Sequence, residues 1–323
     1  MKAVRFSKTG GPEVLTLEDV TLAPPARGQV QLRHTAIGVN FIDIYHRSGL
    51  YPLKLPSGLG LEAAGIVQAV GEGVTNFKLG DRVGYCTGPI GAYAEANNID
   101  ADRAVKLPDA ISDETAAACL LKGMTAQYLL RRTFVVEPGQ TILLHSAAGG
   151  VGLIAAQWAK HLGARVIGTV GSDDKIELAK AHGCEHVLNL AKDDWVARVR
   201  EFTNGQGVPV VYDSIGKDSF SGSLDCLAVH GMMVSFGNSS GPVPAFEPGL
   251  LSAKGSLYLT RPTLFHYTRT PKELQETAND LFAVITSGDV KIAINQRFAL
   301  KDARLAHEAL HSRKTTGATI LIP

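Results

Sequence analysis

The sequence predicts an α/β protein in which a doubly wound, six-stranded parallel sheet is joined to a second, mostly β module. Three observations support this fold class. Residues 2–106 are short β-branched runs broken by glycine and proline, and residues 141–260 alternate apolar runs with amphipathic helices. The chain of 323 residues also exceeds what one hydrophobic core usually supports, so two domains are expected.

The N-terminal module is predicted to consist of strands because its apolar runs are short and rich in β-branched residues. Clear examples are residues 29–36, 64–70 and 81–85. Ser112, followed by Asp113 and Glu114, then has the composition of a helix start, and the helical pattern continues to Leu130. We therefore expect this module to end at about residue 124.

The second module, residues 125–260, alternates predicted strands with helices. The strands are expected at residues 141–145, 165–170, 186–189, 209–213, 231–236 and 256–260. Six strands joined by helical crossovers indicate a parallel, doubly wound sheet.

The last segment is expected to return to the first module. Thr270-Pro271-Lys272-Glu273 combines a capping box with proline at the first helical position, which predicts a helix to about Ser287. Residues 317–323 are typical of a closing strand. The first module would then comprise residues 1–124 and 261–323.

Charge and composition exclude several classes of protein. The net charge is +1 with acids and bases interspersed, so no extended positive field exists to attract nucleic acid or anionic lipid. Residues 1–10 lack the apolar core of a signal peptide, and no run is apolar for long enough to span a bilayer. We expect a cytoplasmic protein.

The cysteines form no ligand pattern. Cys86, Cys119, Cys184 and Cys226 are far apart and never form a C-x-x-C pair, so they are predicted to be buried thiols. A structural zinc lobe is not expected.

The strongest local signal is a glycine-rich turn at residues 141–152, between a predicted strand and an amphipathic helix. The backbone at Gly149, Gly150 and Val151 would face a pyrophosphate, and Gly152 would let the helix pack closely on the strand. Ala147 replaces the first glycine of the usual G-x-G-x-x-G pattern. The alternative is a helix-start loop without a ligand, but the six-strand context favours dinucleotide binding.

The end of the second strand indicates the choice of cofactor. Val170 stands where an NAD enzyme has an acid for the ribose hydroxyl. Gly171 leaves space, while Ser172 and Lys175 could bind a 2′-phosphate, so NADPH is predicted. Lys175 could instead be an ordinary solvated lysine.

Two acids argue against this choice. Asp173 and Asp174 would repel the phosphate if they pointed inward, but we expect them in the first turn of the next helix, where negative charge is favoured.

Several motifs together resemble the quinone oxidoreductase/zeta-crystallin branch of the medium-chain dehydrogenase/reductase superfamily, and bacterial NADPH:quinone oxidoreductases in particular. The matching segments are residues 39–45, 49–52, 59–65, 139–160, 237–241 and 255–262. The resemblance covers essentially the whole chain. It implies a Rossmann dinucleotide-binding domain and a GroES-like catalytic domain.

Two zinc ligands of the zinc-dependent relatives are missing. Asn40 stands in place of their cysteine and Leu61 in place of their histidine, and the loop that carries their structural zinc is reduced to residues 85–91. His34, His46 and Cys119 form no recognisable ligand set. We therefore expect a zinc-independent enzyme.

Without a Lewis acid, hydride transfer favours an acceptor that delocalises charge, such as a quinone or another conjugated carbonyl, and the resemblance places this acceptor between the two domains. An alkene or enone reductase is the alternative enzyme. The likeness to zeta-crystallin also permits a low-turnover, NADPH-bound RNA-binding protein, although the chain lacks an aromatic and basic strip for nucleic acid.

The resemblance also assigns site residues. Asn40, Tyr45 and Tyr51 would line the acceptor end, where either tyrosine could donate a proton or simply form the pocket wall. Other expected cofactor contacts are Phe41, Asp43, Thr125, Ser214, Phe236, Asn238, Arg261 and Arg313. Each arginine could instead be a surface charge.

Two further expectations follow from the family likeness. Leu190 replaces a tyrosine that often lies beside the adenosine phosphate, which weakens the prediction of NADPH. A homodimer is expected through the edge strand at residues 256–260.

Overall fold

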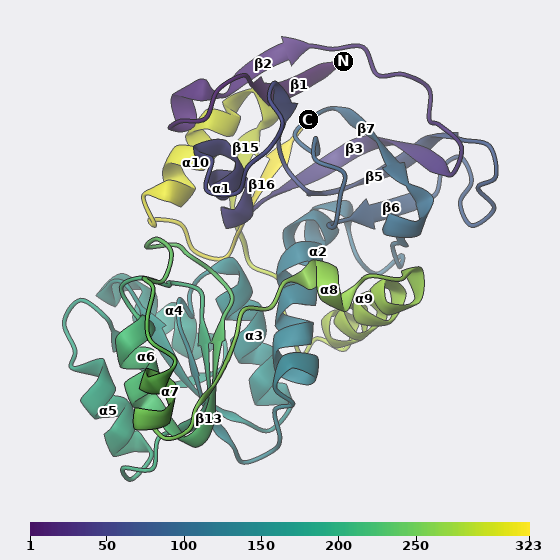
Figure 1. The fold of residues 1–323 in the computed structure, drawn as a ribbon. Coiled ribbons are helices and arrows are strands. Elements are labelled where there is room, and N and C mark those ends of the chain that lie inside the picture. The colour runs from purple at the N-terminus through teal and green to yellow at the C-terminus, as the bar shows by residue number, and fades with distance from the viewer. The chain divides into compact units, whose positions relative to one another are not determined.

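A computed structural model describes all residues, 1–323. The chain forms two compact units. One, called here the mixed-sheet unit, comprises Met1–Met124, Thr268–Thr286 and Ile292–Pro323, and the other, the parallel-sheet unit, comprises Thr125–Tyr267 and Ser287–Lys291. Both chain termini lie in the mixed-sheet unit (Figure 1). Residues 261–267 and 287–291 thus group with the parallel-sheet unit.

The mixed-sheet unit contains two sheets. A small antiparallel sheet has the order β2-β1-β4, and a seven-stranded sheet has the order β15-β16-β3-β5-β6-β8 with β7 also paired to β3. The strands are β1 (Lys2–Phe6), β2 (Thr16–Asp19), β3 (Gln29–Val39), β4 (Ser57–Gly58), β5 (Glu62–Val70), β6 (Arg82–Tyr85), β7 (Ala96–Asp100), β8 (Val105–Lys106), β15 (Ile294–Ala299) and β16 (Ala318–Ile322). The closing strand β16 pairs with β3, as expected for a segment that returns to the first module.

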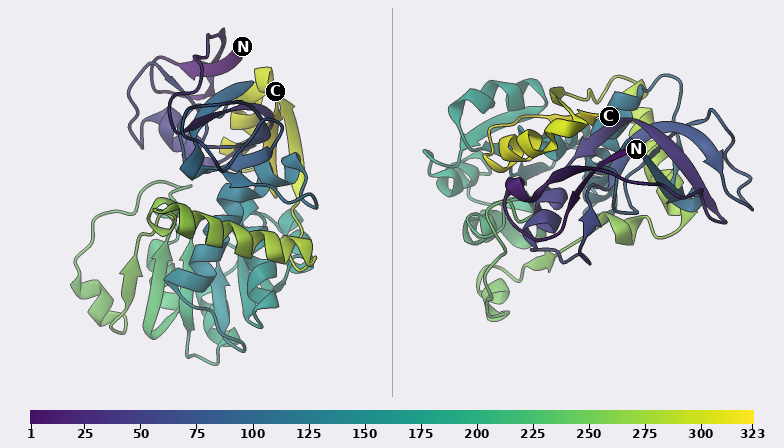
Figure 2. Two further views of the ribbon diagram at one scale, coloured as in Figure 1. Left: turned by 90° about the vertical axis from the view of Figure 1, so that its right-hand side faces the viewer. Right: turned by 90° about the horizontal axis from the view of Figure 1, so that it is seen from above.

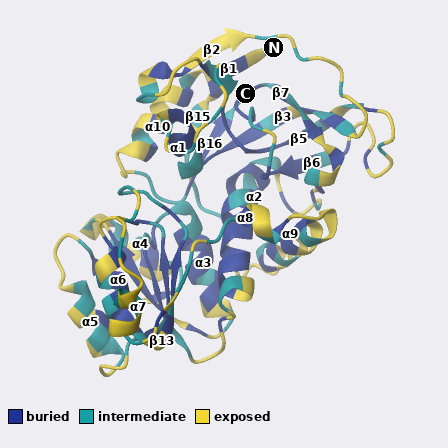
Figure 3. Ribbon diagram, in the orientation of Figure 1, coloured by how far each residue is buried: buried dark blue, intermediate teal, exposed yellow.

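The mixed-sheet unit also contains helices and short 3-10 turns. They are η1 (Pro12–Val14), α1 (Phe41–Ser48), η2 (Ala101–Arg103), α9 (Pro271–Thr286), η5 (Leu300–Asp302), α10 (Ala303–His311) and most of α2 (Asp113–Tyr128). The predicted starts near Ser112 and at Pro271 are confirmed: the Ser112 hydroxyl accepts the Thr115 N–H, and the Glu273 carboxylate accepts the Thr270 N–H. Figure 3 shows buried residues throughout the interior of this unit, and most of them form one hydrophobic cluster.

The parallel-sheet unit confirms the predicted α/β architecture. Its six strands are parallel in the order β11-β10-β9-β12-β13-β14. They are β9 (Thr141–Leu144), β10 (Arg165–Val170), β11 (Cys184–Asn189), β12 (Val208–Asp213), β13 (Leu227–Ser235) and β14 (Tyr258–Thr260). The order reverses beside β9, which is the switch point where doubly wound sheets bind ligands.

Helices flank this sheet (Figures 1 and 2). They are η3 (Leu129–Thr133, a π-helical turn), α3 (Gly150–His161), η4 (Asp173–Lys175), α4 (Ile176–Ala181), α5 (Trp195–Phe202), α6 (Phe220–Cys226), α7 (Gly249–Ala253) and α8 (Leu264–Tyr267). Helices α3 and α4 pack on β10 and β11, and α6 packs on β12 and β13. Leu143, Ile167 and Val211 are buried in the core between these layers.

No helix of the protein is long and apolar enough to cross a bilayer.

Candidate functional site

The glycine-rich turn joins β9 to α3 in the predicted strand-turn-helix order. Gly149 is the N-cap of α3 and offers no side chain, and the first helical turn contains no acid, so the N–H groups there keep their capacity to bind an anion. A Cβ on Gly152 would lie 2.2 Å from the Ser146 carbonyl oxygen. Only glycine fits at that position because the helix start crosses the turn so closely.

The replacement of the usual first glycine by Ala147 has a structural compensation. A Cβ on Gly168 would lie 2.8 Å from the Ala147 Cβ, so the bare backbone of β10 makes room for the alanine methyl group. The Ala147 N–H donates to the Thr169 carbonyl at 2.8 Å, which fixes the turn against β10. The turn therefore keeps its shape despite the departure from the pattern.

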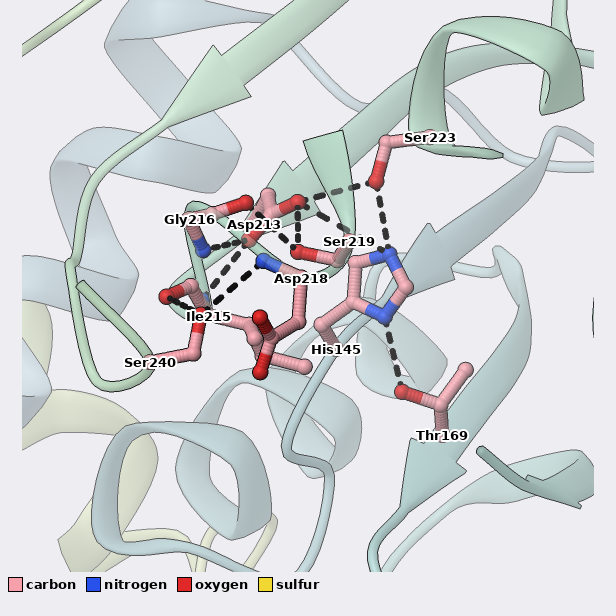
Figure 4. Close-up of polar contacts among 9 residues, drawn as sticks. All are labelled: His145, Thr169, Asp213, Ile215, Gly216, Asp218, Ser219, Ser223 and Ser240. Atoms are coloured by element: carbon pink, nitrogen blue, oxygen red, sulfur yellow. Dashed lines mark hydrogen bonds and ion pairs between the residues drawn. The ribbon is translucent and has the colours of Figure 1, made fainter. Parts of the chain in front are cut away.

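A buried carboxylate shapes the neighbouring loop (Figure 4). Asp213, the last residue of β12, is fully buried, and its Oδ1 accepts the N–H groups of Ile215 at 2.7 Å and Gly216 at 3.0 Å. Its Oδ2 accepts the hydroxyls of Ser219 at 2.6 Å and Ser223 at 2.8 Å. Four donors thus satisfy one carboxylate and hold the chain after β12 in a tight turn.

His145 extends this network across the sheet. Its Nε2 lies 2.9 Å from the Ser223 hydroxyl and its Nδ1 lies 2.8 Å from the Thr169 hydroxyl, as Figure 4 shows. Because the Ser223 proton goes to Asp213, Nε2 must donate to Ser223 and Nδ1 must accept from Thr169. Burial lowers the pKa of His145, and this neutral tautomer satisfies both ring nitrogens.

The loops after β12 and β13 are tied together. The Ser240 hydroxyl donates to the Ile215 carbonyl at 2.9 Å, and the Ser239 N–H donates to the Ser214 carbonyl at 3.1 Å. The Phe236 N–H donates to the Asp213 carbonyl at 2.7 Å. The predicted contacts Ser214 and Phe236 therefore lie at adjacent strand ends.

Arg261 is anchored in the same region. Its Nη1 donates to the Ser235 carbonyl at 2.6 Å. With the Asn238 amide oriented so that its nitrogen donates to the Gly237 carbonyl at 2.9 Å, the amide oxygen accepts from Arg261 at 3.1 Å. Arg261 thus holds the loop that carries Asn238, and contact of Arg261 with phosphate stays a prediction.

The chain is open directly after Val170, the last residue of β10, which stands where an NAD enzyme has its acid. A Cβ on Gly171 would meet no atom within 4 Å. Asp173 and Asp174 begin η4, which confirms the predicted helix start. The Asp173 carboxylate is bound by the Asn189 amide at 2.6 Å and by the Lys192 ammonium, and these partners lower its pKa, Lys192 most strongly. Lys175 follows in the same turn.

In the mixed-sheet unit, Asn40 is buried between β3 and α1. Its side-chain nitrogen donates to Glu62 Oε2 at 2.8 Å. The same oxygen accepts from the Lys122 ammonium at 3.2 Å, and Glu62 Oε1 accepts the Leu121 N–H at 2.6 Å. A Cβ on Gly38 would lie 2.1 Å from the carboxylate, so that glycine provides its space. A buried ion pair thus fixes the orientation of the Asn40 amide.

Tyr45 and Tyr51, predicted to line the acceptor end, do lie together. Their rings meet edge to face with centroids 5.1 Å apart, and the Tyr51 N–H donates to the Tyr45 carbonyl at 3.0 Å. Phe41 lies beside them, with its ring centroid 6.4 Å from that of Tyr45. The helical spacing of α1 brings Phe41 and Tyr45 together, and Tyr51 reaches them from the segment after the helix.

Asp43 is the end of a second buried chain of hydrogen bonds. Its Oδ2 accepts the Asn40 N–H at 2.8 Å and the Tyr93 hydroxyl at 2.9 Å. Tyr93 lies 3.0 Å from His307 Nε2, and His307 Nδ1 lies 3.1 Å from Arg47. Because a guanidinium only donates, the direction is fixed from Arg47 through His307 and Tyr93 to Asp43. Burial raises the pKa of Asp43 to about 7.

The two remaining predicted cofactor contacts, Thr125 and Arg313, belong to different units. Thr125 is buried in α2 and is the first residue of the parallel-sheet unit, whereas Arg313 is exposed after α10 in the mixed-sheet unit. Arg313 has a φ of 58°, which is uncommon for a residue other than glycine. Cofactor contacts of Thr125 and Arg313 stay predictions.

Comparison with known proteins identifies the family. Residues 150–283 match a family of zinc-binding dehydrogenases, and residues 26–109 match the alcohol dehydrogenase GroES-like domain. The chain is 54% identical to a quinone oxidoreductase of Pseudomonas aeruginosa over 100% of this chain and 99% of that protein. The chain belongs to the quinone oxidoreductase family. The predicted fold class, a six-stranded Rossmann sheet with a GroES-like domain, is thereby confirmed.

Two further relatives are similar to this chain over nearly its whole length. The crystal structure of Escherichia coli quinone oxidoreductase complexed with NADPH superposes with a TM-score of 0.99 at 53% identity, with complete coverage of both chains. A 2-haloacrylate reductase of a Burkholderia species is 45% identical over 99% of this chain and 98% of its own length.

The quinone oxidoreductase chain offers no thiolate and imidazole at the zinc-ligand positions. Asn40 is bound to Glu62, and no group of three or more His, Cys, Asp or Glu side chains is placed to hold a metal ion. His34 is bound through Nδ1 to the Ala94 carbonyl at 2.7 Å and through Nε2 to Tyr85 at 3.1 Å. All four cysteines are free and buried, as predicted.

Several of the polar residues that organise the site were not predicted from the sequence. These are Glu62 as the partner of Asn40, Lys122, Tyr93, His307, His145, Asp213 and Lys192. Asp213 ends a predicted strand, so its position at a carboxyl edge is the one signal that points to it.

Proposed function

We propose that this protein is an NADPH-dependent quinone oxidoreductase that works without zinc. The observation that carries the proposal is the uncapped, glycine-lined start of α3 in a chain that matches quinone oxidoreductases over its whole length. The crystallised relative with NADPH supports the same cofactor here.

The parallel-sheet unit has features that fit a dinucleotide phosphate. The N–H groups of Gly150 and Val151 would hold the pyrophosphate because no acid or capping side chain competes for them. Gly149, whose own N–H donates to the Ser146 carbonyl at 2.9 Å, would let the backbone approach the pyrophosphate closely. Beyond β10, the space at Gly171 would admit a 2′-phosphate beside Ser172 and Lys175. Further contacts would come from Ser214, Phe236 and Asn238 at the strand ends, and from Thr125, Arg261 and Arg313. When bound, NADPH supplies the hydride.

The mixed-sheet unit would supply the acceptor end. Asn40 has its amide nitrogen committed to Glu62, so its amide oxygen is the atom that could accept from a ligand. Tyr45 and Tyr51 provide flat, apolar rings and phenol groups against which a quinone could lie, with Phe41 beside them and Asp43 beneath. A quinone accepts the charge itself, so this set needs no metal to stabilise an oxyanion.

The assay that tests this proposal follows NADPH absorbance after addition of benzoquinone or naphthoquinone. We expect turnover that survives prior treatment with a chelator, and a clear preference for NADPH over NADH. Loss of activity on chelation, restored by zinc, would overturn the zinc-free part, and no reaction with any quinone would overturn the activity.

An alkene or enone reductase is a second candidate, because one relative at 45% identity is a 2-haloacrylate reductase. A conjugated acid also delocalises charge after hydride addition, so the same residues could serve it. Comparing kcat/KM for a naphthoquinone and for 2-chloroacrylate separates the two activities, and we expect the quinone to be preferred.

We also propose a homodimer formed through β14. This short strand lies at the edge of the parallel sheet, and Tyr258 on it is 60% exposed. An unpaired strand edge with exposed apolar groups favours pairing with a second copy. Analytical ultracentrifugation should give about twice the chain mass, and a monomer at micromolar concentration would contradict this. A cytoplasmic location stays a prediction.

A further inference from the structure

An acid lies just beyond the position that decides between NADH and NADPH. Val170 ends β10 without a carboxylate, but Asp173 follows three residues later in η4. A free carboxylate near the 2′ position of the adenosine ribose favours the hydroxyls of NADH and repels the 2′-phosphate of NADPH. NADPH can therefore bind well only if the negative charge of Asp173 is neutralised.

The structure shows how this charge is held. Asp173 Oδ1 accepts from the Asn189 amide at 2.6 Å, and Oδ2 accepts from the Lys192 ammonium. Asn189 is buried, and its own Oδ1 accepts the Ala191 N–H at 3.0 Å, so its orientation is fixed. Both carboxylate oxygens of Asp173 thus point to β11 and the loop that follows it.

The other charges near this turn cannot replace Lys192. Asp193 faces the same loop, where its carboxylate accepts the Asn189 N–H at 2.7 Å, so it adds negative charge. Asp174 is also exposed in η4. Lys175 is the other cation in this turn, so three carboxylates face two cations, and without Lys192 they would face Lys175 alone.

We propose that Lys192 determines cofactor specificity by neutralising Asp173, so that the turn after β10 accepts a 2′-phosphate. The proposal rests on the proposed use of NADPH, and it gives Lys192 an indirect role. Lys192 acts through Asp173, with Asn189 fixing the second oxygen. The pair is exposed, with side-chain exposures of 66% for Lys192 and 54% for Asp173, so it contributes little to folding stability.

The size of the effect follows from Coulomb's law. A 2′-phosphate carries nearly two negative charges, so an uncompensated carboxylate beside it in a solvated site repels it about twice as strongly as it would a single charge. Loss of the Lys192 charge should therefore lower the affinity for NADPH relative to NADH about tenfold, and added salt should reduce that change.

The test is a double-mutant cycle on cofactor binding. Dissociation constants for NADPH and NADH are measured by fluorescence titration for the wild type, Lys192→Met, Asp173→Asn and the double variant. We expect Lys192→Met to lower the preference for NADPH about tenfold. In the Asp173→Asn background the same change should alter the preference by less than about twofold, because no carboxylate is left for the loss of Lys192 to release toward the phosphate.

A matched control is Lys180→Met. In the neighbouring helix α4, the Lys180 ammonium pairs with the exposed Glu177 carboxylate at 2.9 Å. The Lys180→Met substitution therefore removes a similar surface ion pair and leaves Asp173 and its partners unchanged. This variant should bind both cofactors as the wild type does. Far-UV circular dichroism of each variant checks that the fold is intact.

Two outcomes would overturn the inference. An unchanged preference in Lys192→Met shows that the Asp173 charge does not matter. An equal loss of NADPH affinity in both backgrounds shows that Lys192 acts on the phosphate through its own charge and not through Asp173. Neither outcome depends on quinone turnover: a wild type that binds NADPH but reduces no quinone refutes the proposed function alone, while the binding cycle still tests Lys192.

Discussion

Replacing Lys122 by methionine should destabilise the mixed-sheet unit strongly. The side chains of Lys122 and Glu62 are 7% and 0% exposed, and the ammonium is the sole counter-charge bonded to the carboxylate. Methionine fills a similar volume but leaves Glu62 charged and buried, with only the Leu121 and Asn40 donors. Breaking a buried ion pair in this way costs about 3–5 kcal/mol of unfolding free energy.

The assay can distinguish the two units. Both tryptophans, Trp158 and Trp195, lie in the parallel-sheet unit, so their fluorescence follows that unit, whereas far-UV circular dichroism follows both. In urea titrations, Lys122→Met should shift part of the circular dichroism transition to lower urea concentration, and the tryptophan fluorescence transition should shift less. Lys122→Arg keeps the positive charge and should therefore lose less unfolding free energy than Lys122→Met.

The double variant Glu62→Gln/Lys122→Met completes the experiment. It removes both charges, so its loss should be smaller than the sum of the two single losses by more than about 2 kcal/mol. If Lys122→Met costs less than about 1 kcal/mol, the carboxylate is not an uncompensated buried charge and the reasoning fails.

Four further results are expected. Burial raises the pKa of Asp43 to about 7, above its ordinary value of 3.8, so the folded state holds a proton that the unfolded state has lost. The unfolding free energy should fall as pH rises from about 4 to about 7, by up to about 4 kcal/mol, and Asp43→Asn should remove that fall in urea titrations at several pH values. Gly152→Ala places a Cβ against the Ser146 carbonyl, and isothermal calorimetry should show NADPH affinity reduced at least tenfold while Gly171→Ala, with open space, is mild. Ser223→Ala removes one donor to Asp213 and the acceptor of His145, so thermal unfolding should report a loss of about 1–3 kcal/mol. The four buried thiols should not react with a thiol reagent until the protein is unfolded in denaturant.

The parts of the fold that could be predicted are those encoded by local pattern. Each predicted parallel strand is an apolar run, and the helix start at Pro271 follows from a capping box four residues long. The glycine turn could be recognised because strand, turn and helix are contiguous. The placement of Ala147 could not be explained from the turn itself, since its room comes from Gly168 on the next strand.

The polar networks could not be predicted because their members are distant in the sequence. Glu62 and Lys122 are 60 residues apart, and His145 and Ser223 are 78 apart. A lysine in a helical run gives no local sign that it will be buried against a carboxylate. Lys192 escaped prediction for a similar reason, since its partner Asp173 lies 19 residues earlier.

Both units use a buried carboxylate to hold a segment assigned to the site. Asp213 gathers two backbone N–H groups and two hydroxyls at the end of β12, and Glu62 gathers Asn40, Lys122 and the Leu121 N–H beside β3. An ionised carboxylate only accepts, so each donor around it can take one orientation and the segment cannot rearrange without exposing a charge to an apolar interior. The ion pair of Glu62 and Lys122 orients Asn40, which requires both charges to be kept together and explains why losing one should be worse than losing both.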